Sequence, residues 1–122
     1  MDCIFCKIAN KEISSNILYE DKEFLAFLDM NQSKIGHTLI IPKKHLEDYS
    51  KLSSEELKKM FDIASILSQK IMKKLNIKGV SLNFNYGSLQ EIKHAHLHIC
   101  PDKENKKKKT VEEIFAILKD DN

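Results

Sequence analysis

Three histidines stand at every second position of a short apolar segment. His94, His96 and His98 occupy the first, third and fifth positions of the sequence HAHLHI. Because side chains two residues apart share one face of a β-strand, this spacing predicts a strand with a core face and a histidine face. Such a face could be the polar side of a half-exposed strand, a metal cage, or a set that supplies an acid, a base and a nucleophile.

The sequence begins with two cysteines at metal-ligand spacing. Cys3 and Cys6 form a C-x-x-C pair, which can bring two thiolates to one zinc ion that then needs two further ligands. Thioredoxin-like redox sites use the same spacing, but there the motif follows a strand, and only two residues precede Cys3. The candidates for these two ligands are histidines. His45 stands apart from the three alternating histidines in the sequence, and His94 is the first of those three. Four protein ligands would make the zinc structural, whereas three imidazoles and a water would make a metal hydrolase.

Length and composition predict a single domain over residues 1–122. The 122 residues, 42% of them hydrophobic, suffice for one core. No apolar run approaches the ~18 residues of a membrane span, and the first residues lack the features of a signal peptide. We therefore expect no membrane association and a cytoplasmic location, where thiols stay reduced. The third cysteine, Cys100, is expected at the edge of the core.

The charge distribution gives little sign of a nucleic-acid partner. The net charge is only +2, and the lysine run at residues 106–109 contains no interleaved aromatic residues that could stack on bases. We interpret the run as a solvated loop. Neither a P-loop nor a dinucleotide-binding fingerprint occurs in the sequence, so any phosphate must be held by side chains and a turn.

Alternation and turn signals predict the elements that position these residues. Strands are expected at 16–21, 23–29 and 37–42, followed by a hairpin of 80–85 and 92–100 across a turn at 86–88. A capping box of Ser53 and Glu56 opens a long helix that should end near Gly79, and Thr110 with Glu113 opens a shorter one. These elements predict an α+β domain with a mostly antiparallel sheet and the histidine strand near its middle.

In combination, the motifs resemble those of the histidine triad family, in its Hint-like branch with a C-x-x-C zinc site. HAHLHIC is similar to the triad signature, and CIFCKI, YEDKEFLAFLDMNQSKIGHTLIIPKKH, Asn83 and Gln90 stand in the order expected of that branch. The resemblance covers about residues 1–101 and leaves out the lysine-rich loop and C-terminal helix of 102–122. The sequence departs from many members at Leu89 and Glu91, where they have glycine and a hydroxyl residue.

The resemblance implies nucleotide hydrolysis or nucleotidyl transfer at phosphorus. In such proteins the middle histidine, here His96, attacks the α-phosphate of a purine nucleoside phosphoramidate, adenylate or dinucleotide polyphosphate, and water hydrolyses the nucleotidyl-histidine. His98 would assist by proton transfer. Asp29 matches the carboxylate that accepts the ribose hydroxyls, although alone it would pass as a turn-forming residue. His37 is expected near the site in a structural or supporting role.

The resemblance also implies further binding residues, a metal and a partner. The zinc ligands would be Cys3, Cys6, His45 and His94, a closed and therefore structural site. The apolar slot for the purine is matched by Ile4, Phe5, Ile8, Phe27 and Leu39, and the polar groups around the phosphate by Asn83, Ser88 and Gln90. Related proteins form homodimers through the long helix and the strand after it. The alternative function is a purine-nucleotide-binding module, regulatory or partner-binding, with little turnover.

Overall fold

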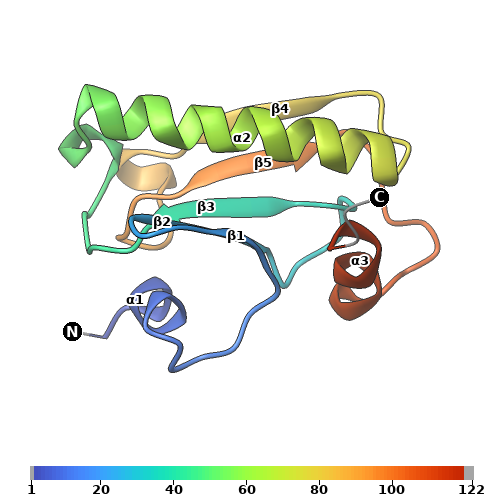
Figure 1. Cartoon of the computed structure of the whole chain (residues 1–122), viewed down its shortest axis with the longest axis horizontal. Helices are drawn as coiled ribbons and strands as arrows, with labels where there is room; N and C mark the ends of the chain where they lie inside the picture. Colours follow the sequence, from blue (N-terminus) through green and yellow to red (C-terminus); the bar gives the residue numbers. More distant parts are fainter. Residues whose placement is uncertain (1, 120–122) are drawn as a thin grey trace.

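A five-stranded antiparallel sheet forms the centre of the structure, a computed structural model that describes residues 2–119 (Figure 1). The strand order is β1-β2-β3-β5-β4. The helices and strands are α1 (Ile4–Ala9), β1 (Ile17–Glu20), β2 (Phe24–Leu28), β3 (Thr38–Pro42), α2 (Ser54–Lys74), β4 (Val80–Phe84), β5 (Leu97–Pro101) and α3 (Val111–Leu118). This architecture confirms the predicted α+β fold with one long and one shorter C-terminal helix.

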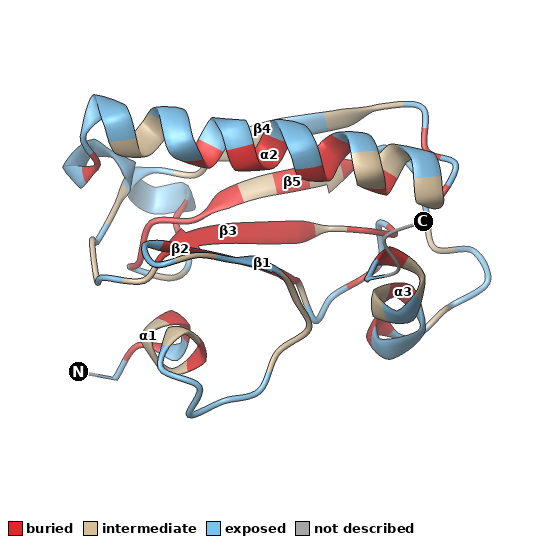
Figure 2. Ribbon diagram, in the orientation of Figure 1, coloured by how far each residue is buried: buried red, intermediate tan, exposed pale blue. Residues whose placement is uncertain are grey.

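The two faces of the sheet are covered by different helices. Strands β2 and β3 are buried along their whole length, because α2 lies across one face and α1 across the other (Figures 1 and 2). The larger core joins α2 and α3 to one set of alternate strand residues, among them Ala26, Ile40 and Leu97. The smaller core joins α1 to the opposite set, which includes Phe27 and Leu39.

Local signals fixed where the two longer helices begin. The capping boxes of Ser53 with Glu56 and of Thr110 with Glu113 are both present, at the starts of α2 and α3. The predicted end of the long helix near Gly79 is wrong, because α2 ends at Lys74. Asn76 adopts a positive φ of 54° just beyond that end, which turns the chain out of the helix in the way that glycine usually does.

The histidine strand is shorter than its pattern predicted. Strand β5 begins only at Leu97, so His94 and His96 lie in the irregular segment before it. The expected turn at 86–88 is a short 3-10 helix, Gly87–Leu89, within a twelve-residue connection from 85 to 96. Strands β4 and β5 still pair antiparallel. Strand β5 lies inside the sheet, next to the edge strand β4.

The lysine run lies outside helices and strands, as predicted. Residues 102–110 connect β5 to α3, and the side chains of 106–108 are exposed. Among residues 2–119, no helix combines the length and the apolar character that crossing a membrane requires.

Candidate functional site

Four candidate metal ligands meet at one end of the sheet. The side chains of Cys3, Cys6, His45 and His94 each offer a ligand atom, and these four atoms all lie within 4.8 Å of one another. Cys3 Sγ lies 3.4 Å and Cys6 Sγ 3.6 Å from His94 Nδ1, and Cys6 Sγ lies 3.3 Å from His45 Nδ1. In a tetrahedral zinc site, neighbouring sulfur and nitrogen ligands are about 3.6 Å apart. The quartet is therefore close to the shape that zinc requires.

The helix α1, which the sequence did not predict, arranges the two thiols. Cys3 is its N-cap and Cys6 lies in its first turn, and residues three apart share one side of a helix. Burial raises the pKa of the Cys6 thiol, and the neighbouring Cys3 adds to the effect. A raised pKa favours the protonated Cys6 thiol, so zinc would displace this proton on binding.

Hydrogen bonding fixes which nitrogen of His94 is free for a metal. His94 Nε2 lies 2.8 Å from the carbonyl oxygen of Pro42. A carbonyl only accepts, so Nε2 carries the proton and the lone pair of Nδ1 faces the sulfurs. His94 is fully buried, and this burial lowers its pKa. Its neutral form suits a metal ligand.

The same argument leaves one nitrogen of His96 free for nucleophilic attack. His96 Nδ1 donates to the carbonyl oxygen of His94 over 2.8 Å, so the lone pair is on Nε2. Burial lowers the pKa of His96, although the bond to the His94 carbonyl opposes the shift. The ring also packs edge-on against Phe5, with centroids 5.0 Å apart. His96 is thus a neutral imidazole in a fixed orientation.

Sheet register places four of the predicted site residues in one row. Phe27 pairs with Leu39, Leu39 with His98, and His98 with Asn83, across β2, β3, β5 and β4. Paired residues of antiparallel strands point to the same face. The row therefore runs from the apolar core under α1 to a polar half of the same face.

A directional chain of polar contacts runs through His98. His98 Nδ1 lies 3.1 Å from His37 Nε2, and His37 Nδ1 lies 3.7 Å from the Asp29 carboxylate. Because the Asp29 carboxylate only accepts, it favours the His37 tautomer with the proton on Nδ1, which leaves Nε2 to accept from His98 Nδ1. Burial, together with His96 and His37, lowers the pKa of His98 to about 4. Asp29 is also a turn former, since its other oxygen accepts from the Asn31 amide over 2.8 Å.

The chain continues through two asparagines to a thiol. Asn85 Nδ2 lies 3.5 Å from His98 Nε2, and Asn85 Oδ1 accepts from Asn83 Nδ2 over 3.1 Å. The Cys100 thiol donates to Asn83 Oδ1 over 3.6 Å. Each donor in this series meets an acceptor, so the lone pair of His98 Nε2 faces the Asn85 amide.

The apolar residues matched to the purine slot divide into two groups. Phe5, Ile8, Phe27 and Leu39 are buried together in the smaller core, with the rings of Phe5 and Phe27 5.7 Å apart. Ile4 instead lies 46% exposed on the outer side of α1. The buried group reaches His96 through the Phe5 ring. That this group forms a slot for a purine stays a prediction.

Gln90 and Ser88, also matched to the phosphate, do not lie in the sheet beside His98 as Asn83 does. The Gln90 amide nitrogen donates to the carbonyls of Glu47 and Ile92, over 2.6 and 2.9 Å, so it stabilises the connection before β5. Ser88 lies exposed in the 3-10 helix. Their contact with a phosphate also stays a prediction.

The metal-hydrolase hypothesis requires His94, His96 and His98 around one ion. In the part of the chain that the structure describes, the groups able to hold a metal are the quartet and a second set, His37, His98 and Cys100. The three triad histidines form no such group there, because His94 and His96 point their lone pairs to different sites.

Comparison with known proteins identifies the family. The model of the HIT domain family matches residues 10–105, most of the chain. The chain belongs to the HIT family. It is 42% identical over 101 residues to an uncharacterized HIT-like protein of Methanocaldococcus jannaschii, which covers 81% of this chain and 78% of that protein.

Two further relatives of this HIT protein bear on activity and metal. It is 38% identical to the adenosine 5'-monophosphoramidase of Saccharomyces cerevisiae over 104 residues, 85% of this chain and 65% of the relative. A solved structure of a zinc-bound histidine triad family protein from Mycobacterium smegmatis superposes with a TM-score of 0.86 at 30% identity, covering 98% of this chain and 91% of the other.

Asn85 is the residue near the HIT histidines that the sequence analysis missed. It lies just after β4, and only the pairing of β4 with β5 brings it to His98. Asn85 stands two residues after Asn83 and would share its face in an extended strand. This is a weak signal, since an asparagine after a strand is equally typical of a turn.

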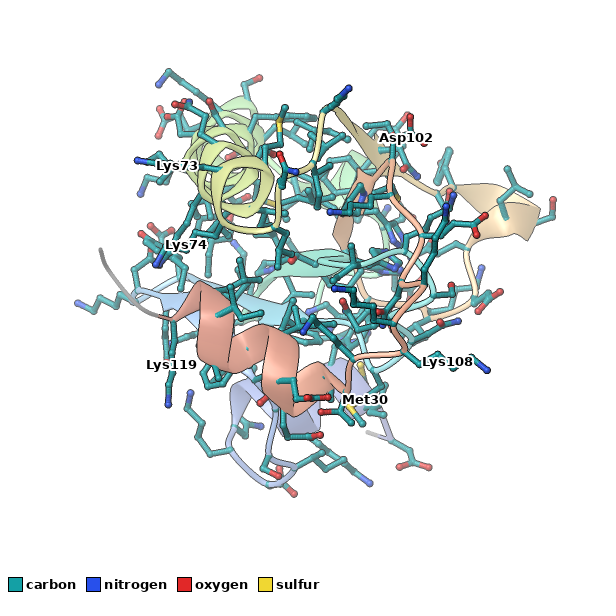
Figure 3. The ribbon with its side chains drawn as sticks, turned by 90° about the vertical axis from the view of Figure 1, so that its right-hand side faces the viewer. Met30, Lys73, Lys74, Asp102, Lys108 and Lys119 are labelled. Carbon is teal, nitrogen blue, oxygen red and sulfur yellow. The ribbon has the colours of Figure 1, made fainter. Side chains whose placement is uncertain are left out.

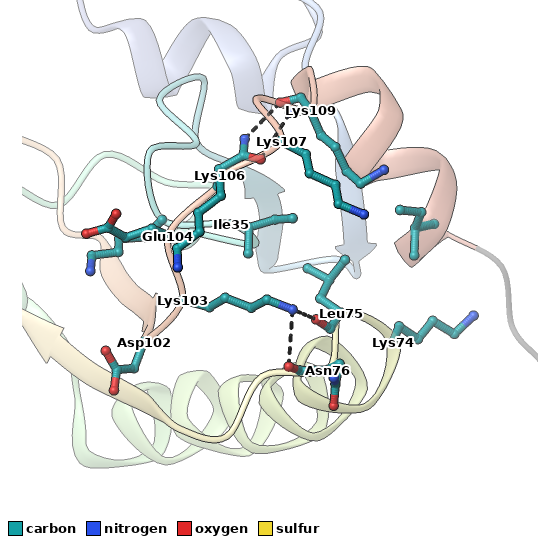
Figure 4. A pocket seen from close by; sticks show the side chains of 13 residues that line it. Ile35, Lys74, Leu75, Asn76, Asp102, Lys103, Glu104, Lys106, Lys107 and Lys109 are labelled. Atoms are coloured by element: carbon teal, nitrogen blue, oxygen red, sulfur yellow. Dashed lines mark hydrogen bonds between the residues drawn. The ribbon is translucent and has the colours of Figure 1, made fainter.

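A hollow of about 780 Å³, whose lining includes no histidine, lies between the C-terminal end of α2 and the 102–109 loop (Figure 4). Figure 3 shows this end of the molecule, with the lining residues Lys74 and Asp102 labelled. Lys103 reaches across it and donates to the carbonyls of Leu75 and Asn76, over 2.9 and 3.3 Å. This ammonium caps the negative end of α2. The hollow is lined by Lys34, Ile35, Lys74, Leu75, Asn76, Asp102, Lys103, Glu104, Asn105, Lys106, Lys107, Lys109 and Ile117.

Proposed function

We propose that this HIT protein hydrolyses purine nucleoside phosphoramidates or adenylates, and related dinucleotide polyphosphates, in the manner of the Hint-like branch. One observation carries the proposal: the bond from His96 Nδ1 to the His94 carbonyl, which leaves the Nε2 lone pair free. An imidazole oriented in this way and neutral at pH 7 is a competent nucleophile. The similarity to a yeast adenosine 5'-monophosphoramidase supports the substrate class.

The reaction takes two displacements at the α-phosphorus. In the first, the lone pair of His96 Nε2 forms a bond to phosphorus, and the bond from phosphorus to the leaving nitrogen or oxygen breaks. In the second, water attacks the nucleotidyl-histidine, the bond from phosphorus to Nε2 breaks, and the nucleotide leaves with the water oxygen.

His98 is assigned the proton transfers of both steps. It adjoins the nucleophile, with its ring centroid 4.8 Å from that of His96. An anionic phosphate nearby favours the protonated form of an imidazole, so substrate counteracts the burial that lowers the pKa of His98. The proton then passes to the leaving group in the first step, and His98 takes one from water in the second.

Asp29 and the apolar cluster are assigned to the nucleoside. The carboxylate follows β2 directly, half-buried beside His37, where it could accept both ribose hydroxyls. Phe5 packs against His96 and Phe27 packs against Phe5, and both rings would contact the purine. Asn83, Ser88 and Gln90 would contribute to the phosphate end, Gln90 by holding the connection before β5.

Zinc is assigned to Cys3, Cys6, His45 and His94. With four protein ligands it leaves no open position for water and therefore serves the structure. The site joins α1 to the segment before β5, which carries the nucleophile. A zinc-bound relative of the same fold supports the assignment. The three cysteines form no disulfide, which is consistent with a cytoplasmic protein.

A homodimer through α2 and β4 is part of the proposal. Strand β4 is an edge of the sheet, and unpaired edges of soluble folds are usually protected. Phe61 of α2 is 42% and Tyr86 52% exposed, and both belong to an aromatic group around Phe84 and Tyr49. A partner copy would cover this group and continue the sheet.

The test is turnover of a fluorogenic adenosine phosphoramidate together with rapid acid quench of a labelled nucleotide. We expect saturable release and a labelled protein adduct. His96→Ala should lose nearly all kcat and the adduct but keep nucleotide binding, because ground-state contacts remain. Lys93→Ala, an exposed change in the same segment, is the matched control. A His96→Ala protein as active as wild type would refute the assignment of the nucleophile.

The alternative is a binding module that holds a purine nucleotide without useful turnover. It predicts saturable nucleotide binding in wild type and His96→Ala alike, with neither release nor adduct in either protein. The same two measurements therefore distinguish the two functions.

A further inference from the structure

The second metal-ligand set lies on the polar half of the histidine face. His37, His98 and Cys100 each place a ligand atom within 4.8 Å of the other two. His98 and Cys100 are alternate residues of β5, and His37 immediately precedes the neighbouring strand β3. All three are half-buried. The set shares no residue with the cysteine-histidine quartet.

The geometry of this set is close to that of a zinc site. In tetrahedral zinc, two nitrogen ligands are about 3.4 Å apart, and nitrogen and sulfur about 3.6 Å. His37 Nε2 and His98 Nδ1 are 3.1 Å apart, which is close to the nitrogen–nitrogen distance of a tetrahedral zinc site. The sulfur of Cys100 lies within 4.8 Å of both residues' ligand atoms, so it would have to approach each nitrogen by about 1 Å to reach this spacing. A rotation of the Cys100 side chain can supply such a movement.

Donor chemistry favours zinc over harder cations. Two imidazoles and one thiolate are borderline-soft ligands, which select zinc and its neighbours rather than magnesium or calcium. Binding would replace the hydrogen bond between the two histidines, shift the His98 proton from Nδ1 to Nε2, and release the Cys100 thiol proton to solvent. With three protein ligands, the fourth position would be filled by water or by an oxygen of a bound phosphate.

We propose that His37, His98 and Cys100 form a second, weaker zinc site whose occupation inhibits the enzyme. Inhibition rests on the proposed function, because it follows from the proton-transfer role of His98. A zinc ion on His98 Nδ1 takes the nitrogen that now donates to His37. The imidazole then can neither keep its contact with His37 nor gain a second proton while the ion stays bound.

A substitution of Cys100 can separate inhibition by zinc from basal turnover. Its thiol donates to Asn83 Oδ1 over 3.6 Å, and it touches neither the nucleophile nor the proposed ribose carboxylate. Cys100→Ser keeps a donor for Asn83 but removes the thiolate that zinc prefers. The variant should therefore retain basal turnover and lose inhibition by zinc.

The binding test uses protein that first receives one zinc per chain and is then titrated with Co²⁺. Zinc binds such sites more tightly than cobalt, so the quartet keeps its zinc and cobalt reports the second set. We expect a thiolate-to-cobalt charge-transfer band in wild type and its loss in Cys100→Ser. No band in wild type, or an equal band in Cys100→Ser, would overturn the site.

The activity test adds buffered zinc to the same one-zinc protein with an adenosine phosphoramidate. Wild type should be inhibited, and Cys100→Ser should need at least about 10–100 times more free zinc, the loss typical of weakening a metal's ligand environment. Equal inhibition of both proteins, or activation of wild type, would overturn the inhibitory role. A protein without any turnover would refute the proposed function, while the cobalt band would still decide whether the site exists.

Discussion

Replacing Gly36 should destabilise the protein through two effects that the chain allows us to separate. Gly36 has a positive φ of 93°, and a Cβ built on it would lie 2.9 Å from Leu75 Cδ1 and 3.0 Å from Ile71 Cγ2. Both contacts belong to the buried face and end of α2. A side chain at this position is therefore strained in its backbone and crowded by the core.

The cost of Gly36→Ala follows from these two effects. Backbone strain of this kind costs about 1–3 kcal/mol, and an extra carbon in a packed core costs about 1–3 kcal/mol. The free energy of unfolding should fall by about 2–6 kcal/mol. Two other glycines serve as controls. Gly87 has a positive φ of 65° but open space around its Cβ, and Gly79 has neither constraint.

The assay is urea unfolding of the three alanine variants at one protein concentration. Gly87→Ala should lose about 1–2 kcal/mol from backbone strain alone, and Gly79→Ala should be neutral or gain about 0.4–1 kcal/mol. Gly36→Ala should lose more than Gly87→Ala. If Gly36→Ala were as stable as Gly79→Ala, the close approach of Gly36 to α2 would be refuted.

Three further changes test the metal, the titration of His98 and the dimer. Elemental analysis should find one zinc per chain at the quartet, absent from a Cys3→Ser, Cys6→Ser variant that also melts at lower temperature, since an ion at 1,000 times its Kd contributes about 4 kcal/mol. Full metal content in the variant would contradict the site. Because the pKa of His98 is lowered to about 4 from 6.5, the unfolded chain takes up its proton first, so stability present above pH 6.5 should be lost between pH 6.5 and 4. Melting curves should show a smaller loss in His98→Asn than in wild type, and identical losses would contradict the shift. Light scattering should show a dimer that Phe61→Lys weakens and Ile66→Lys, 68% exposed on α2, does not; a monomeric wild type at micromolar concentration would contradict it.

The sequence predicted best where a local signal decides the structure. The capping boxes of α2 and α3 form because their side chains and amides are three residues apart, whatever the rest of the chain does. The turn between β1 and β2 is equally local, since Asp21 accepts from the amides of Glu23 and Phe24 over 2.7 and 2.8 Å. Short apolar runs bounded by turn residues then indicated β2 and β3.

The pattern around His94 misled because a strand and an extended connection can share it. The amide of Ala95 bonds to the carbonyl of Leu46 rather than to a neighbouring strand, and Gln90 bonds to two carbonyls of the same region. Side chains and a distant loop thus replace the ladder, and no spacing within residues 92–96 indicates such partners. The series of polar contacts from Asp29 to Cys100 could not be predicted from the sequence either, because it depends on how the strands pair.

Helix α1 was missed because six residues are too few for a periodic signal. Its C-x-x-C spacing nevertheless indicated the shared metal site, since the motif depends only on one turn. Ile4 was assigned to the purine slot with Phe5 and Ile8, but it lies exposed on the other side of that turn. Ile4 points away from Phe5 and Ile8 because the segment is helical, and the sequence analysis did not predict this helix.

The shortness of α1 has a consequence for local unfolding. A helix of this length is not stable alone, and its N-cap makes no side-chain hydrogen bond, so packing of Phe5 and Ile8 under the sheet must hold it. Any opening of α1 would carry away both thiols and the ring that packs on His96 in a single event. In hydrogen exchange, the candidate metal ligands of α1 and the apolar cluster beside His96 would therefore behave as one cooperative unit, less protected than strands β2 and β3.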